Sequence, residues 1–136
     1  MLNKLLSNFY KKILFFALSG SIGFIVDFTL LFTLRYFFPL ESLRLFTMLA
    51  SIITTWLLNR SYTFKFYNKK SFIEFILYLS SISIGALMNY LSFMYIFYET
   101  KFILLSFVIG SFSGFFVNFL LANKIYTYLK KNSQKL

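Results

Sequence analysis

Four long apolar stretches alternate with short polar ones along the chain. The apolar stretches cover about residues 13–34, 45–62, 72–97 and 102–122. Each is close to the roughly 20 residues that an α-helix needs to cross the hydrocarbon core of a bilayer. Pro39 falls in the first connection, where it interrupts no helix. The pattern predicts an all-α integral membrane protein with four transmembrane helices in one domain, residues 1–136.

Composition excludes the soluble classes of protein. Hydrophobic residues make up 59% of the chain and charged residues 13%, whereas soluble domains are about 45–50% apolar and about 25% charged. A water-soluble fold of this length could not bury so many apolar side chains. The chain has no Cys and no His, which removes the usual zinc ligands and the commonest acid–base group. We therefore predict no enzyme, no catalytic residues, no metal site and no cofactor.

The basic residues indicate topology. The net charge is +10, and the Lys and Arg residues lie between the apolar stretches, which favours contact with anionic membrane lipids over nucleic acid. Eleven of the 14 fall on one side of the predicted membrane, leaving Arg35, Arg44 and Lys101 on the other. The positive-inside rule then predicts a multi-pass protein of the cell inner (cytoplasmic) membrane with both termini cytoplasmic.

The two halves of the chain correspond to each other. At an offset of 64, residues 56–64 (WLLNRSYTF) match residues 120–128 (LLANKIYTY). At an offset of 62, Gly23 matches Gly85 and Asp27 matches Asn89. Because each half contributes two spans, both halves would enter the membrane in the same direction, which predicts a parallel 2+2 internal repeat.

Each predicted helix carries a stripe of small or polar residues, since positions three, four and seven apart share a face. The glycines of these stripes are expected to allow close helix packing; they are Gly20, Gly23, Gly85, Gly110 and Gly114. Their polar members predict an intramembrane polar site of Asp27, Asn89 and Asn118. An acid inside a span faces a partner or a wet cavity. For Asp27 the partner would be Asn89, Arg35 or a hydroxyl, so an Asp27→Asn exchange should keep the fold.

Two amide–cation pairs end the second and fourth stretches, Asn59–Arg60 and Asn123–Lys124. Each would lie at the cytoplasmic headgroup level, where cations and amides bind phosphate oxygens. We predict that these four residues bind a lipid phosphate; the alternative is that the cations only mark the membrane boundary. As surface cations, Arg60 and Lys124 should be removable without loss of the fold.

Between about Lys11 and Tyr128 the chain resembles the GtrA-like family of small four-span membrane proteins. Three segments carry the resemblance: FFALSGSIGFIVDF, TWLLNRSYTF and VNFLLANKIYTY. Thr55–Trp56 stands where the family has Asn-Phe. The resemblance implies a flippase that moves an undecaprenyl-phosphate-linked monosaccharide to the outer leaflet for glycosylation of cell-surface polysaccharide or teichoic acid. The implied partners are that polyprenyl-phosphate sugar lipid and membrane glycosyltransferases of the same pathway.

Two other functions remain open at this point. The chain could be a non-transporting membrane subunit that anchors or activates a glycosyltransferase. A small cation exporter that uses Asp27 ranks last, because such exporters have weak charge bias. A flippase needs a polar groove, and a four-span monomer has little room for one. We therefore predict a homo-oligomer.

The charge distribution makes a direct prediction about topology. A reporter fused after Lys131 should read cytoplasmic, and one inserted at Ser42 should read external, because basic loops stay inside. Opposite readings in intact cells would contradict the assigned orientation.

Overall fold

The computed structural model describes residues 2–68 and 71–133, with side-chain surroundings for residues 7–68 and 71–132. Its elements are α1 (Leu2–Leu34), α2 (Leu40–Leu58), the π-helix η1 (Asn59–Thr63), α3 (Phe72–Thr100), α4 (Ile103–Ser113) and α5 (Phe115–Ser133). The described chain is helical, with no strand, which confirms the predicted class. Three basic residues used in the charge argument, Lys69, Lys70 and Lys135, lie outside the described residues, as does the side chain of Lys4.

Four helical segments are long and apolar enough to cross a membrane, as predicted. They are Ser7–Leu34, Leu40–Thr63, Phe72–Thr100 and Ile103–Asn132. The second begins five residues before the predicted start at 45. Pro39 precedes it with φ −58°, and a proline at the start of a helix fixes a suitable φ without losing a needed donor.

Two of the spans depart from regular α-helix. The second widens into η1 at its end, where the Phe64 amide donates to the Asn59 carbonyl at 2.8 Å. The fourth is interrupted at Gly114, between α4 and α5. π-helical turns are frequent at functional sites. The segment η1 is therefore one to inspect for function.

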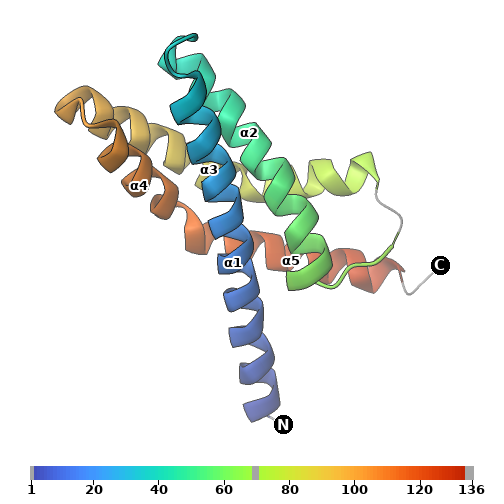
Figure 1. Ribbon diagram of the computed structural model, residues 1–136. Helices are drawn as coiled ribbons and strands as arrows, with labels where there is room; N and C mark the ends of the chain where they lie inside the picture. Colours follow the sequence, from blue (N-terminus) through green and yellow to red (C-terminus); the bar gives the residue numbers. More distant parts are fainter. Residues whose placement is uncertain (1, 69–70, 134–136) are drawn as a thin grey trace.

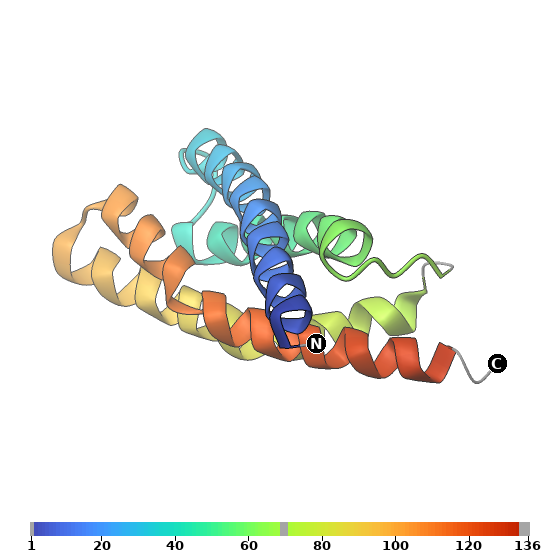
Figure 2. The same cartoon turned by 90° about the horizontal axis from the view of Figure 1, so that it is seen from below.

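The helices form two hairpins that cross each other (Figures 1 and 2). One consists of α1 and α2, and the other of α3 with α4 and α5. Each hairpin is made of two consecutive spans, an arrangement that the predicted parallel repeat requires. The parallel 2+2 relation between the halves stays a prediction.

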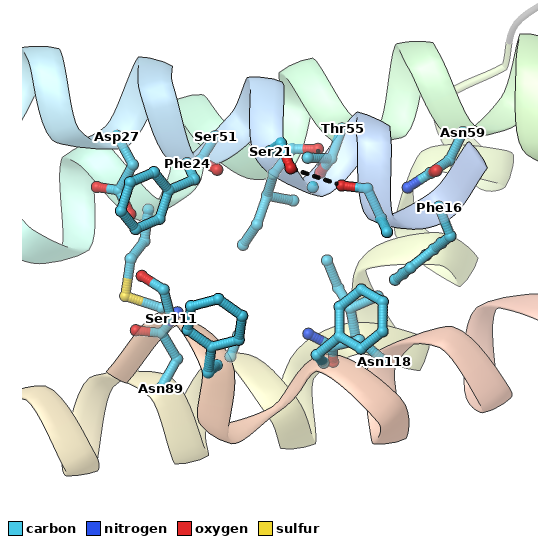
Figure 3. Close-up of a pocket in the computed structure, with 18 of the residues that line it drawn as sticks. Phe16, Ser21, Phe24, Asp27, Ser51, Thr55, Asn59, Asn89, Ser111 and Asn118 are labelled. Carbon is cyan, nitrogen blue, oxygen red and sulfur yellow. Dashed lines mark hydrogen bonds between the residues drawn. The ribbon is translucent and has the colours of Figure 1, made fainter. Parts of the chain in front are cut away.

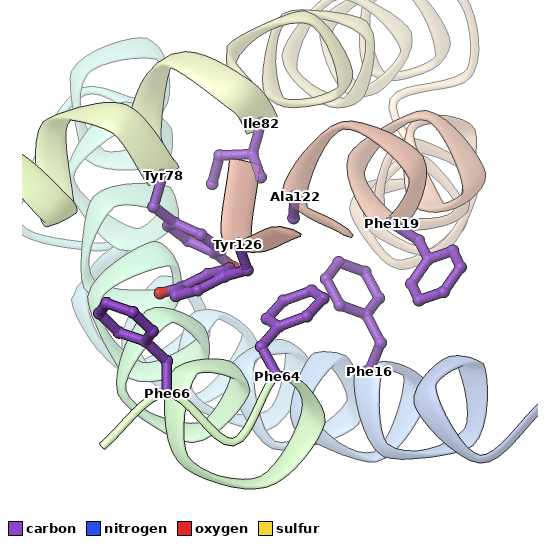
Figure 4. Close-up of a cluster of buried hydrophobic side chains, with 8 residues drawn as sticks. All are labelled: Phe16, Phe64, Phe66, Tyr78, Ile82, Phe119, Ala122 and Tyr126. Atoms are coloured by element: carbon purple, nitrogen blue, oxygen red, sulfur yellow. The ribbon is translucent and has the colours of Figure 1, made fainter. Parts of the chain in front are cut away.

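Two separate clusters of buried apolar side chains join the hairpins. The first, which we call the aromatic cluster (Figure 4), contains Phe16, Phe64, Phe66, Tyr78, Ile82, Phe119, Ala122 and Tyr126. The second, the outer cluster, contains Leu31, Leu43, Phe93, Met94 and Phe107. Under the predicted orientation the aromatic cluster is near the cytoplasmic side. Between the two clusters the hairpins are free to diverge.

Glycines allow close approach of helices at several points. A side chain would overlap a neighbouring helix at Gly23, Gly85, Gly110 and Gly114. At Gly114 the obstacle is the backbone of Gly85, which cannot rotate away. Gly20 differs, because an added Cβ there would meet no atom within 4 Å.

This contrast predicts the stability of two alanine variants. Gly114→Ala should lower the free energy of unfolding by about 1–3 kcal/mol, because overpacking forces the α3 backbone to move. Gly20→Ala should be neutral or raise it by up to about 1 kcal/mol, through helix propensity. Unfolding in detergent micelles measures both. Equal stability of the two variants would contradict the close approach of Gly114 and Gly85.

Candidate functional site

A cavity of about 760 Å³ lies between the two hairpins (Figure 3). Residues of α1, α2, α3, α4 and α5 line it, and Asn59 of η1 closes one end. The rim includes Ile25, Phe112 and Phe116, which are 61%, 73% and 70% exposed. Since large apolar side chains on the outside of a membrane protein face lipid, the cavity opens sideways toward the bilayer.

All three residues of the predicted intramembrane polar site line this cavity. Asp27 and Asn89 lie at one end and Asn118 lies nearer the other (Figure 3). Gly20 also lines it, which explains the open space beside this glycine. The stripes of small and polar residues on α1, α3 and α5 therefore contribute residues to the same cavity.

At the predicted outer end of the cavity, Asp27 forms an ion pair with Arg44. Arg44 Nη1 donates to Asp27 Oδ1 at 2.6 Å and Oδ2 at 2.5 Å, and Nη2 donates to Asn89 Oδ1 at 2.7 Å. Arg44 is completely buried, and Asp27 is 4% exposed. Hydrogen bonds between charged groups are stronger than neutral ones. One guanidinium thus connects α1, α2 and α3.

Aromatic rings complete the surroundings of Arg44. Its Cζ lies 4.8 Å from the ring centre of Phe93 and 4.9 Å from that of Phe107. A cation held over a ring face is attracted by the negative charge of the π system. The guanidinium is therefore stabilised by an acid, an amide and two rings.

The sequence interpretation of Arg44 is wrong: it is not in an outer connection but inside α2. The early start of α2 at Leu40 brings it into the helix. Its spacing could have shown this, because Arg44, Thr47 and Ser51 lie three and four residues apart and share a face. Arg44 was also absent from the partners considered for Asp27.

The middle of the cavity offers hydrogen-bonding groups to a ligand. Ser21 donates to Ala17 O at 3.0 Å and Thr55 donates to Ile52 O at 3.0 Å, so both hydroxyl oxygens can still accept. Asn118 Oδ1 is buried and has no partner within the described part of the chain. Buried polar atoms are nearly always paired in native proteins. An unpaired amide beside a cavity is a contact that a bound molecule could complete.

A second polar network closes the opposite end. The buried side chain of Asn59 donates through Nδ2 to Tyr78 Oη at 3.1 Å and accepts from Thr63 Oγ1 at 2.8 Å. Both polar atoms of the Asn59 amide are therefore occupied by protein.

Arg60 lies beside this network and forms a bidentate ion pair with Glu74. Its Nε donates to Oε1 at 2.8 Å and its Nη2 to Oε2 at 2.9 Å. Tyr126 donates a further hydrogen bond to Glu74 Oε1 at 3.0 Å. Arg60 is only 5% exposed, so the interpretation of Arg60 as a surface cation is wrong. Its charge is balanced inside the protein.

The other amide–cation pair has different surroundings. Asn123 Oδ1 accepts from Lys12 Nζ at 3.0 Å. Lys124 is exposed and does not line the cavity. Lipid phosphate binding by Asn59, Arg60, Asn123 and Lys124 stays a prediction. No group of three or more potential metal-ligating side chains occurs among the residues whose placement is described.

Fold and site together define a four-span helical membrane protein with a cavity that opens sideways and has both apolar and polar side chains in its lining. Residues 15–128 match the family described as GtrA/DPMS, transmembrane domain, so the chain belongs to this family. No curated protein and no solved structure gives a significant match. Membership supports involvement in the handling of polyprenyl-phosphate-linked sugars at the membrane. Members are generally non-catalytic translocases or membrane subunits.

The buried ion pair changes what is expected of Asp27→Asn. Removing one partner of a buried pair leaves an uncompensated charge, which lowers the free energy of unfolding by about 3–5 kcal/mol. Asp27→Asn and Arg44→Met should each do so. The double variant should lose much less than the sum, because removing both charges leaves no uncompensated charge in the interior. The free energy of unfolding in detergent micelles, measured for the wild type, both single variants and the double variant, gives the coupling between Asp27 and Arg44. Arg35→Met is the control.

Arg35 is suitable for comparison because it is half-buried and forms no ion pair within the described part of the chain; its guanidinium lies over the rings of Phe32 and Tyr36 and donates to Tyr36 Oη at 2.6 Å. Its loss should lower the free energy of unfolding by less than about 1 kcal/mol, as for a surface contact. Additive losses at Asp27 and Arg44 would contradict their coupling.

Proposed function

We propose that the chain is a flippase for a polyprenyl-phosphate-linked monosaccharide, such as an undecaprenyl phosphate sugar. It would move this lipid from the cytoplasmic to the outer leaflet of the inner membrane. There the sugar would serve glycosylation of cell-surface polysaccharide or teichoic acid. The observation that carries the proposal is the cavity that opens sideways between the hairpins and carries hydrogen-bonding groups on a mainly apolar wall.

The physical problem of such a transporter is a polar headgroup inside hydrocarbon. Each unsatisfied polar group there costs several kcal/mol. Ser51, Thr55 and Asn118 provide hydrogen-bonding groups along the cavity wall. The volume of about 760 Å³ is within the range of about 300–1,000 Å³ that is typical of small-molecule sites. These groups can hydrogen-bond to hydroxyls of the sugar.

The side opening solves the second part of the problem. A prenyl chain is too long to fit inside a cavity of about 760 Å³. With Ile25, Phe112 and Phe116 at an open rim, the chain can remain in lipid while only the headgroup enters. Apolar rim residues also match the chemistry of the prenyl chain.

The hairpins are held together at both ends of the cavity. The network of Arg44, Asp27 and Asn89 lies at the predicted outer end, and the aromatic cluster lies at the predicted cytoplasmic end. Transport requires the two ends to open in turn. Phosphate contacts by Asn59, Arg60, Asn123 and Lys124 belong to this proposal, in which Arg60 would exchange Glu74 for the phosphate.

The proposed assembly is a homo-oligomer that works with membrane glycosyltransferases. Because one chain already contains a cavity of this size, the second copy would not be needed to form the groove. It would instead cover part of the exposed apolar surface.

Asn118 provides a test of the cavity. Asn118→Leu keeps the shape of the side chain and removes its polar atoms. Flipping of a labelled polyprenyl phosphate hexose in liposomes should fall at least tenfold, while stability in micelles should not fall, because Asn118 Oδ1 has no protein partner to lose. A single hydrogen bond of about 1.5 kcal/mol accounts for a tenfold effect.

Thr33→Val is the matched control. Thr33 is exposed on α1 and bonds to its own helix through Thr29 O at 2.7 Å, so its loss should leave flipping unchanged. Normal flipping by Asn118→Leu would contradict the role of the cavity. If the wild-type chain moves no lipid but stimulates a glycosyltransferase, the protein is a non-transporting subunit.

A further inference from the structure

A second hollow of about 490 Å³ lies on the predicted cytoplasmic side, and we call it the basic pocket. It is lined by Asn8, Phe9, Lys11, Lys12, Phe15, Tyr62, Thr63, Phe64, Lys65 and Lys130. These residues come from three separate parts of the chain: the first half of α1, the segment around the end of η1, and the end of α5. The fold therefore brings together lysines that are far apart in sequence.

The charged side chains that line the basic pocket are all basic. The lining contains Lys11, Lys12, Lys65 and Lys130, but no Asp or Glu among the residues that the structure describes. Lys12 uses one of its three donors on Asn123 and keeps two. An anion with several oxygen atoms would complement this lining.

The backbone at Lys65 is a second, independent sign of a specialised site. Lys65 has φ 50°, in the left-handed region that side chains seldom adopt. Such conformations cost about 1–3 kcal/mol and cluster at ligand-binding segments. Here the conformation accompanies the placement of a lysine at the rim of the basic pocket.

The basic pocket lies next to the main cavity. Phe64 lines the basic pocket and Phe16 lines the cavity, and their rings contact edge to face with centroids 6.4 Å apart. Both residues belong to the aromatic cluster (Figure 4). Phe9 and Phe15, 40% and 38% exposed, give the pocket an apolar edge where a lipid chain could lie. A headgroup in the pocket would be one aromatic contact away from the cavity.

We propose that the basic pocket binds the phosphate of an anionic lipid headgroup in the cytoplasmic leaflet. The identity of the lipid as polyprenyl phosphate rests on the proposed function; the recognition of a phosphate does not. The headgroup binds in the basic pocket first and enters the main cavity when Phe16 and Phe64 separate. Lys11, Lys12, Lys65 and Lys130 surround the phosphate, and the prenyl chain leaves past Phe15.

Neighbouring lysines on α5 allow a matched test. Lys130 lines the basic pocket, whereas Lys131 is exposed and does not. The probe is polyprenyl phosphate without a sugar, in phosphatidylcholine nanodiscs that contain the full-length protein. Lys130→Gln and Lys65→Gln should each weaken binding about fivefold, the effect of about 1 kcal/mol per cation near an anionic lipid. Together they should weaken it about 25-fold, and Lys131→Gln less than twofold.

Two further ligands identify what the pocket recognises. Uncharged polyprenol should bind without any dependence on Lys130. Inorganic phosphate should compete only weakly; if it displaces the lipid at an equal concentration, the phosphate site stands and its ligand is soluble. Equal losses in Lys130→Gln and Lys131→Gln would overturn the proposal, because binding would then depend only on general surface charge.

The same proteins separate this proposal from the proposed function. Lysine-dependent binding without flipping in liposomes would leave the basic pocket standing and end the flippase proposal. Normal flipping together with unchanged lipid binding in the Lys65→Gln/Lys130→Gln double variant would support the flippase proposal and contradict phosphate binding in the basic pocket.

Discussion

The buried guanidinium of Arg44 is the interaction on which the architecture depends. It joins α2 to Asp27 of α1 and to Asn89 of α3, so it fastens one hairpin to the other. A buried charge without a partner is strongly unfavourable, and these three helices must therefore stay together at this end. The pair of Arg60 and Glu74 ties η1 to α3 at the opposite end. With both ends held, the hairpins can diverge between them, and the cavity of about 760 Å³ occupies that space.

Polar groups in this chain fall into two kinds. Those with protein partners, such as Arg44 and Arg60, fix the helices. Those without an ion-pair partner in the described part of the chain include Asn118 and Lys65, which border the two hollows. The proposed transport and loading steps use this second kind. Position alone does not separate the two kinds, because Asp27 lines the cavity and is also an ion-pair partner.

Periodicity and charge were enough to predict the class, the four spans and the polar faces that hold Asp27, Asn89 and Asn118. They failed where a role depends on a distant partner. The predicted second span begins at residue 45, five residues after α2 starts at Leu40, and Arg44 therefore falls outside the predicted span. Arg60 was read as exposed, although Glu74 shares a face with Tyr78 and Ser81 and points into the same interior. The basic pocket combines three segments whose meeting is decided by tertiary packing, so no local pattern predicts it.

The central claim is that the headgroup of a lipid-linked sugar occupies the cavity between the hairpins. The chain has no Cys, so a Ser51→Cys variant can be labelled at one cavity position and a Ser42→Cys variant at one exposed position near the start of the same helix. The most direct measurement is the labelling rate with a small polar thiol reagent, with and without polyprenyl phosphate hexose. We predict that the lipid slows labelling at position 51 at least tenfold and leaves position 42 unchanged. Equal labelling at position 51 with and without the lipid would contradict the account.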